Sequence, residues 1–250
     1  MALCASTDPI IKGIAMNNLR SSFTIKKLPV IFIVLILGVM GCAKKPSLTV
    51  TLAPAVPESM ALSDVADIDW YLPSGHSGAE LEKGEIIPYD RKANAGYIKG
   101  VTAQLMDQQI LAFTGITNYS WSGGERFKDT TSTAVAISML FDAKTKPGNF
   151  TVTATIPTDD VYVVIHGGCV GIVANVEVKL EQETAKQELN CKSDDDLKDQ
   201  QWTYQVQVKN AEKKDLTIVI SNLDAEYNLP GLTISAIMMS KHTLIAAKNN

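Results

Sequence analysis

The sequence lacks the short motifs that mark the common classes of enzyme. It contains no G-x-S-x-G nucleophile elbow, no H-E-x-x-H zinc motif, no P-loop and no G-x-G-x-x-G dinucleotide fingerprint. Histidine is scarce, since the 250 residues include only three: His76, His166 and His242. A catalytic triad or a zinc site would have to use His76 or His166, and we interpret His166, which ends a predicted strand, as a structural or rim histidine. These absences argue against a hydrolase.

Long runs of basic residues are also missing. The formal net charge is -4 at pH 7, with 23 Lys and Arg against 27 Asp and Glu, and no block of lysine and arginine occurs. Nucleic acid is therefore not expected as a partner. The acidic stretch Asn190–Asp196 does not have the spacing of an EF-hand loop, so we interpret it as a solvated turn and expect neither a metal nor a cofactor.

A signal for export lies near the N-terminus. Lys26 and Lys27 precede the unbroken apolar run Leu28–Met40, which ends at Gly41 and Cys42. A basic segment, an apolar segment and a small-residue processing site in this order are typical of a secretory signal. At about thirteen residues, the apolar run is shorter than the ~20 that a membrane-spanning helix needs. Everything after Cys42 is therefore expected outside the cytoplasm, and the alternative, an uncleaved N-terminal anchor, gives the same location.

The residues Val39-Met40-Gly41-Cys42 resemble the lipobox of bacterial lipoproteins. The resemblance implies that Cys42 is diacylated on its sulfur and becomes the mature N-terminus after cleavage. Ala43, rather than aspartate, follows the cysteine, which implies sorting to the outer membrane in a Gram-negative organism. Stable anchoring takes two acyl chains, because a single chain binds a bilayer only marginally. We accordingly expect a signal peptide over residues 1–41, with Met16 as the true start, and a lipidated tether over residues 42–66.

Cysteines are few, and the four have different expected roles. Cys4 precedes the signal and Cys42 is the lipid candidate, which leaves Cys169 and Cys191 in the exported part. Exported domains with two cysteines usually oxidise them, so we expect a Cys169–Cys191 disulfide. Closing a loop of about twenty residues stabilises a fold by about 3 kcal/mol in the chain-entropy model. The alternative is a pair of small buried thiols.

Sustained helical periodicity is missing from the exported part, whereas two-residue alternation is frequent. Apolar residues alternate with polar ones over Phe150–Ile156, Ile172–Leu180 and Trp202–Lys209, which is typical of half-buried strands. Roughly eight strands at short, even spacing predict an all-β fold, an antiparallel β-sandwich or jelly roll, in one domain over residues 67–242. A start near Ser47 is the alternative, Asp69–Gly100 is expected to be rich in loops, and residues 243–250 are expected to form a tail.

Aromatic residues make up only 6% of the sequence, and two groups of them lie near glycines. Asp69-Trp70 and the stretch YSWSGGERF, Tyr119–Phe127, place tryptophan in predicted loops. Exposed aromatic rings stack on the apolar faces of sugars, and neighbouring charged side chains bond the hydroxyl groups. The alternative is that Trp70 and Trp121 pack beneath loops and close the ends of the sandwich. The candidate ligand-binding residues are Trp70, Tyr119, Trp121, Glu125 and Arg126.

The order of these motifs, followed by closely spaced strands over Trp202–Lys209, Leu216–Leu223 and Leu232–Met239, resembles β-sandwich modules of secreted bacterial carbohydrate-active proteins. Those modules are similar to galactose-binding-domain-like jelly rolls, and the likeness covers about Asp69–Lys241. The resemblance implies a jelly-roll fold and a non-catalytic role in carbohydrate binding. Such modules commonly begin D-W-x-H-W-G, whereas this chain reads D-W-Y-L-P-S-G from Asp69, without the histidine and the second tryptophan.

Together these features predict a membrane-anchored extracytoplasmic lipoprotein with a non-catalytic β-sandwich that binds carbohydrate. Its expected partners are the membrane, through the lipid anchor, and a glycan or an envelope protein. The alternative is a structural or complex-assembly lipoprotein of the envelope without a small ligand, and a hydrolase ranks third.

Overall fold

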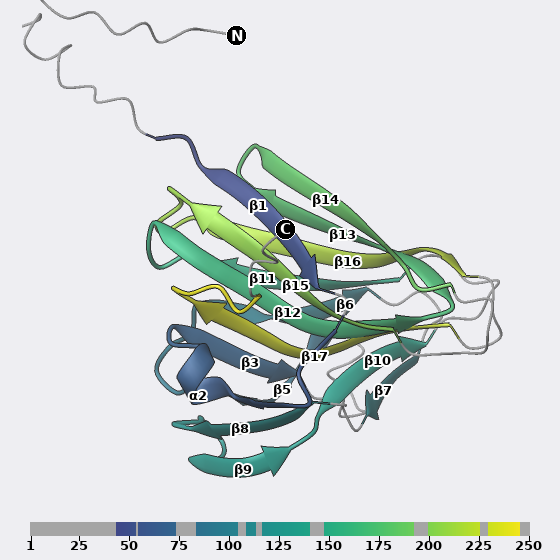
Figure 1. The fold of residues 1–250 in the computed structure, drawn as a ribbon, viewed down its shortest axis with the longest axis horizontal. Coiled ribbons are helices and arrows are strands. Elements are labelled where there is room, and N and C mark those ends of the chain that lie inside the picture. The colour runs from purple at the N-terminus through teal and green to yellow at the C-terminus, as the bar shows by residue number, and fades with distance from the viewer. Residues whose placement is uncertain are drawn as a thin grey trace, which may run out of the picture. The chain divides into compact units, whose positions relative to one another are not determined.

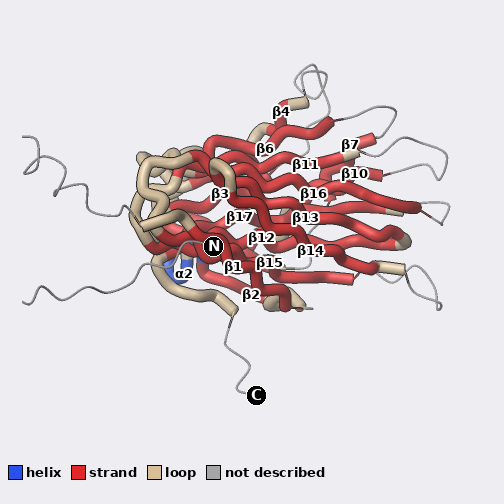
Figure 2. The backbone as a smooth tube through the Cα atoms, turned by 90° about the horizontal axis from the view of Figure 1, so that it is seen from above, coloured by secondary structure: helices blue, strands red, loops and turns tan. Residues whose placement is uncertain are grey.

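The computed structural model describes residues 44–53, 55–73, 84–104, 109–113, 117–140, 148–192, 200–225 and 230–245. The chain divides into two units, Met1–Ala43 and Lys44–Asn250, and all of the described residues belong to the second. The predicted signal peptide, Cys42 and His76 therefore lie outside the described residues. Figure 2 shows that strands account for most of the described chain, with the short helix α2 (Leu62–Val65) as an exception. No helix in the described ranges is long and apolar enough to cross a bilayer.

Two antiparallel sheets form a β-sandwich, which confirms the predicted all-β class (Figure 1). In spatial order the first sheet contains β1 (Ser47–Ala53), β15 (Gln200–Lys209), β12 (Asp160–Val170), β17 (Gly231–Ser240), β10 (Ala136–Leu140) and β7 (Gln109–Phe113), and β3 (Asp69–Pro73) and β5 (Pro88–Arg91) continue it beside β17. The second sheet contains β14 (Glu183–Asn190), β13 (Ile172–Leu180), β16 (Asp215–Ala225), β11 (Asn149–Thr155), β6 (Ile98–Gln104) and β4 (Glu85–Ile86).

A third, smaller sheet, called here the cover sheet, consists of β2 (Ser59–Ala61), β8 (Asn118–Ser122) and β9 (Asp129–Thr133). Its strands β2 and β8 are parallel, whereas β8 and β9 are antiparallel. Figure 1 shows α2 and the cover sheet on the side of β3 and β5, away from β14. The cover sheet adds a layer that a simple two-sheet sandwich does not have.

The main hydrophobic core lies between the first and second sheets. Along β13, Val176 and Val178 are fully buried, whereas Glu177 and Lys179 face outward and form an ion pair with an N–O distance of 3.2 Å. The alternation predicted for this segment is therefore confirmed, because side chains point to opposite faces at successive positions of a strand. The predicted inward face of β15 also lies in this core, and its members are Trp202, Tyr204, Val206 and Val208.

A second core lies between the outer face of the first sheet and the cover sheet. On β12, Val163 faces the main core while Val164 faces the second one, and Tyr71 and Trp70 divide in the same way on β3. Strands that are buried on both faces have nearly continuous apolar sequences, which explains the run of hydrophobic residues in β17. The second core consists of Leu62, Ala66, Trp70, Leu72, Tyr119, Trp121, Val164, Ala236 and Met238.

The predicted boundaries of the domain need correction at the N-terminal end. Strand β1 pairs with β15 from Ser47 opposite Lys209 to Ala53 opposite Thr203, so the chain is part of the first sheet from Ser47 onward. Leu62 of α2 is fully buried in the second core. The prediction of a tether over residues 42–66 is therefore wrong for Ser47–Ala53, which form an edge strand of the first sheet.

The first residues of the predicted C-terminal tail also contact the domain. The side-chain oxygen Oε1 of Gln205 accepts hydrogen bonds from the Thr243 hydroxyl at 3.1 Å and from the Leu244 backbone N–H at 2.8 Å. Leu244 packs against the second core. Residues 243–245 thus lie along β15, while 246–250 are outside the described residues.

The prediction of a loop-rich region over Asp69–Gly100 is wrong for three segments, because β3, β4 and β5 lie within it. These strands are short, and Pro73 and Pro88 stand at their ends, so the region carries the composition of loops. The estimate of roughly eight strands was correspondingly low, since the described ranges contain seventeen strands. Trp70 lies on β3 and Trp121 on β8, rather than in loops.

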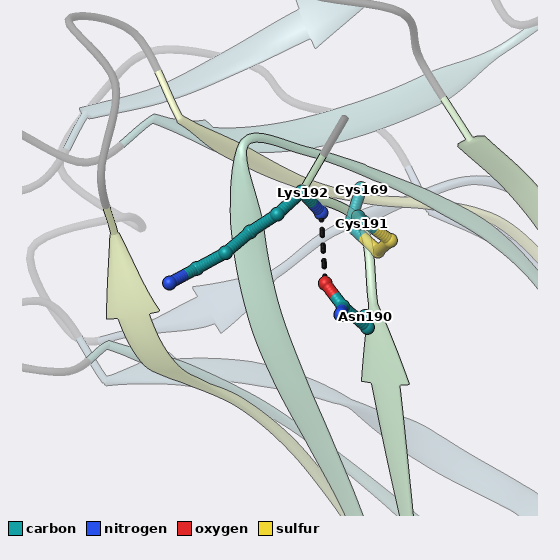
Figure 3. The surroundings of a disulfide bond; sticks show 4 residues. All are labelled: Cys169, Asn190, Cys191 and Lys192. Atoms are coloured by element: carbon teal, nitrogen blue, oxygen red, sulfur yellow. Dashed lines mark hydrogen bonds between the residues drawn. A yellow bond between two sulfur atoms is a disulfide. The ribbon is translucent and has the colours of Figure 1, made fainter. Parts of the chain in front are cut away.

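The predicted disulfide between Cys169 and Cys191 is confirmed (Figure 3). Cys169 lies near the end of β12 in the first sheet, and Cys191 directly follows β14 in the second sheet, with a Cα–Cα distance of 5.7 Å. The Gly171 N–H donates to the Cys191 carbonyl at 3.0 Å. The bond therefore links the two sheets at the corner where the chain passes from β12 into β13.

His166 lies inside the fold, in a buried hydrogen-bond network beneath the cover sheet. Its Nδ1 atom is 3.0 Å from the hydroxyl oxygen of Tyr119, which is itself 3.0 Å from the Ser235 hydroxyl oxygen. The side chain is 1% exposed, and burial lowers its pKa to about 4. The imidazole is therefore neutral at pH 7 and contributes a structural contact between β12 and β8.

We predict that acidification destabilises the protein through His166. The unfolded histidine has a pKa near 6.5 and the folded one about 4, so between these values the unfolded state binds more protons. The free energy of unfolding is then fully retained above pH 6.5 and falls by up to about 3 kcal/mol as the pH drops to 4.

Urea unfolding at a series of pH values measures this loss, and the variant His166→Gln identifies its source. This variant is expected to flatten the profile between pH 4 and 6.5, because glutamine does not titrate. An equally steep profile in His166→Gln would contradict the assignment.

Candidate functional site

Strand β5 and the turn between β8 and β9 together form an open cleft. The cavity has a volume of about 420 Å³. Its lining combines apolar and charged side chains, a composition that suits a small polar ligand. The lining residues are Ile87, Pro88, Tyr89, Asp90, Arg91, Glu125 and Arg126.

Two glycines allow the β8–β9 turn to approach β5 closely. Gly123 has a φ of +72°, in the left-handed region where glycine is favoured. A Cβ atom on Gly124 would collide with the Asp90 carboxylate and with the Phe127 carbonyl oxygen. The Gly-Gly pair therefore allows the tight turn and also leaves room for a buried carboxylate.

The Asp90 carboxylate fixes the turn to β5. Its Oδ1 atom accepts the backbone N–H groups of Arg91 at 2.8 Å and Arg126 at 2.9 Å. Its Oδ2 atom accepts the indole N–H of Trp121 at 2.9 Å and the backbone N–H of Phe127 at 3.1 Å. Asp90 is only 2% exposed, and four N–H donors compensate for the loss of water around it.

Four aromatic rings run from the second core to the cleft. The centroids of Trp70 and Trp121 are 5.5 Å apart, those of Trp121 and Tyr89 6.4 Å, and those of Tyr89 and Phe127 5.3 Å. Trp70 is 1% exposed and Trp121 4%, whereas Tyr89 and Phe127 are half-buried. The rings at the surface are therefore those of Tyr89 and Phe127, and the tryptophans support them from below.

Three of the five candidate residues thus have buried rings. Trp70, Trp121 and Tyr119 offer no face on which a sugar could stack, so the expectation of exposed rings needs correction. The alternative, in which the tryptophans pack inside the fold, describes them correctly. They lie on strands rather than beneath loops, Trp121 on β8 of the cover sheet and Trp70 on β3 of the first sheet. Tyr119 belongs to the network around His166, because the cover sheet places its hydroxyl group there.

The other two candidates, Glu125 and Arg126, do line the cleft. The Glu125 carboxylate accepts a hydrogen bond from Nε of Arg91, and this bond together with the arginine charge lowers the pKa of Glu125. The Arg126 guanidinium lies 5.2 Å from the centroid of the Phe127 ring, which is a cation–π arrangement. The structure therefore brings both charged candidates together with Tyr89 and Arg91.

Sequence reasoning missed Tyr89, Asp90, Arg91 and Phe127. The segment Pro88–Arg91 lies in the region predicted as loops, and its four residues carry no recognisable motif. Phe127 is the last residue of the aromatic–glycine stretch, but it is not among the predicted ligand-binding residues. A signal was available in the acidic residue between Tyr89 and Arg91, since an aspartate within a strand needs several donors once it is buried.

The Asp69-Trp70 pair has a structural role. Asp69 is 2% exposed, and its Oδ2 atom accepts the backbone N–H groups of Tyr97 at 2.7 Å and Ile98 at 2.8 Å. Burial raises the pKa of Asp69, and these N–H donors act in the opposite direction. The carboxylate joins β3 of the first sheet to the start of β6 in the second.

Both carboxyl groups of the cleft are engaged by hydrogen-bond donors of the protein itself. A glycosidase needs one carboxyl group with a raised pKa as its general acid. The Asp90 oxygens are occupied by four N–H donors, and Arg91 lowers the pKa of Glu125. Within the described ranges, no cluster of three or more His, Cys, Asp or Glu side chains has the geometry to hold a metal ion.

Comparisons with known proteins give no family. No family model matches the chain, and no curated protein shows significant sequence similarity to it. Among solved structures, the TmCBM61 module in complex with beta-1,4-galactotriose is 11% identical, with a TM-score of 0.37 over 68% of this chain and 100% of that one.

Two other solved structures are similar at the same level. The adhesin domain of Epf from Streptococcus pyogenes is 10% identical, with a TM-score of 0.32 over 77% of this chain and 58% of that one. The enzymatically active domain of tailspike protein 4 from bacteriophage CBA120 is 6% identical, with a TM-score of 0.38 over 56% of this chain and 19% of that one. At these scores and identities, the similarities carry no argument about the function of this chain.

We predict that Asp90→Asn destabilises the protein by about 3 kcal/mol, because an amide NH₂ group would face N–H donors and the charge-assisted bonds would be lost. Denaturant unfolding at pH 7 measures the change. The control is Asp129→Asn on β9, an exposed position where the expected change is within about 0.5 kcal/mol. If both variants unfold like the wild type, Asp90 does not hold the turn.

Proposed function

We propose that the protein is a membrane-anchored extracytoplasmic lipoprotein whose β-sandwich binds carbohydrate at the β5 cleft without catalysing a reaction. The observation that carries the proposal is the convergence of a half-buried tyrosine ring, Tyr89, with three charged side chains, Arg91, Glu125 and Arg126, around one open cavity. Sugars present both apolar C–H faces and hydroxyl groups, and this combination of side chains meets both.

The rigidity of the cleft supports binding. Tyr89 stacks on Phe127 at a centroid distance of 5.3 Å and meets Trp121 edge-on, so its ring position is determined by packing. The backbone at Arg126 and Phe127 is fixed by the Asp90 carboxylate. A site that is ordered before binding loses less conformational entropy when the ligand arrives, which favours affinity.

The proposed location rests on the N-terminal sequence and on the cysteines. The basic and apolar segments before Cys42 are typical of a lipoprotein signal, and a disulfide is expected of a chain outside the reducing cytoplasm. Because β1 begins at Ser47, only residues 43–46 separate the proposed lipid from the first strand. Such a segment spans at most about 18 Å, so the domain would stay close to the bilayer.

We predict that Tyr89→Ala lowers carbohydrate affinity about tenfold, because the ring that stacks on the sugar contributes on the order of 1–2 kcal/mol. A glycan array with the full-length protein in detergent identifies a ligand, and calorimetry then compares variants. Tyr97→Ala is the matched control, since Tyr97 is 38% exposed and lies outside the cleft.

Two outcomes would contradict the binding proposal. One is equal affinity of Tyr89→Ala and the wild type for the ligand found. The other is the absence of binding to every glycan on the array, which would favour a structural or complex-assembly role in the envelope.

We predict that Cys42 carries the lipid. Cells grown with labelled palmitate should incorporate the label into the wild type but not into Cys42→Ser. The Cys42→Ser variant should also appear as the longer, unprocessed chain on gels, since cleavage follows lipidation. Label retained in Cys42→Ser would refute the anchor.

A further inference from the structure

Some charged side chains of the cleft already have partners within the protein, and others do not. Among the lining residues, Asp90 and Glu125 are acidic and Arg91 and Arg126 are basic. The Asp90 carboxylate is buried and accepts four N–H groups, so it faces the protein rather than the cavity. The groups that a ligand meets are therefore two guanidinium groups and one carboxylate.

The single outward-facing carboxylate is paired. Glu125 accepts the Nε hydrogen of Arg91, and the Glu125 backbone N–H donates to the Arg91 carbonyl at 2.8 Å. These two hydrogen bonds hold the β8–β9 turn against β5. Because the side-chain bond uses only Nε, N–H groups on the terminal nitrogens of Arg91 remain to donate to a second acceptor.

The guanidinium of Arg126 is oriented but not neutralised. It lies over the Phe127 ring at 5.2 Å, while its own backbone N–H is held by Asp90 at 2.9 Å. The side chain is exposed, and within the described part of the chain no carboxylate forms an ion pair with it. Stacking on an aromatic face leaves the N–H edge of a guanidinium free for an acceptor in its plane.

We infer that the cleft is selective for an acidic saccharide, with the carboxylate of a uronic acid unit on the Arg126 guanidinium and the sugar ring against Tyr89. This inference rests on the proposed function and names its ligand class. A planar guanidinium matches a carboxylate through two parallel hydrogen bonds, whereas a neutral hydroxyl group leaves the charge of Arg126 without a partner. Sulfate and phosphate esters share the oxyanion chemistry, so the test includes them.

Three polysaccharides distinguish the possibilities. Polygalacturonate carries the carboxylates, its methyl ester has the same backbone with the charges masked, and dextran sulfate offers a different oxyanion. Binding to the full-length protein in detergent is measured at low and at high salt. The acid is expected to bind at least tenfold more tightly than its methyl ester at low salt, and salt should reduce the difference.

Variants at the arginine test the assignment to one residue. Arg126→Gln is expected to abolish the preference for the acid, and Arg126→Lys to retain part of it, since lysine keeps the charge without the planar fork. Lys209→Gln, an exposed position at the end of β15, removes the same charge away from the cleft and is expected to keep the full preference. Thermal unfolding confirms that each variant is folded.

Different results would contradict the preference for an acidic saccharide and the binding of carbohydrate itself. Equal affinity for the acid and its methyl ester, or an unchanged preference in Arg126→Gln, would overturn the inference and leave carbohydrate binding intact. Tighter binding to dextran sulfate than to polygalacturonate would overturn the carboxylate assignment. Failure to bind any of the three polysaccharides, together with an empty glycan array, would overturn both.

Discussion

The buried carboxylate of Asp90 is the constraint on which the cleft depends. A charge removed from water is stable only where donors replace the water, and here the donors come from β5 itself, from the β8–β9 turn and from an indole ring. Satisfying one carboxylate therefore determines where the turn lies, where Trp121 packs and how Arg126 is presented. The glycine at position 124 follows from the same requirement, because any side chain there would displace the oxygen.

The cover sheet explains why this arrangement lies outside an ordinary sandwich core. The middle strands of the first sheet are buried on both faces, so one side packs against the second sheet and the other against β8 and α2. The aromatic rings extend from that outer core to the surface at β5. The cleft is thus an extension of a hydrophobic core, which gives it rigidity that loops alone would not supply.

The sequence predicted β11 and β13 well, because they alternate between one buried and one more exposed face. On β15 the predicted inward face is buried, but Thr203 and Gln205 of the opposite face are buried as well. The sequence predicted the short strands between Asp69 and Thr133 poorly, since prolines, glycines and strands of two to five residues have the composition of loops. Glu125 and Arg126 were recognised from the aromatic–glycine stretch. Tyr89 and Asp90 were not, because their role depends on a contact across about 35 residues that no local pattern encodes.

The position of β1 has a mechanical consequence for an anchored protein. This strand is the first one after the proposed lipid, and it is paired with β15 over seven consecutive residues, starting at Ser47 opposite Lys209. In an anchored protein, tension between the bilayer and a bound ligand would enter the domain at Ser47. A pull along the strand axis would load all hydrogen bonds of this ladder in shear together, whereas a pull across it would break them one after another.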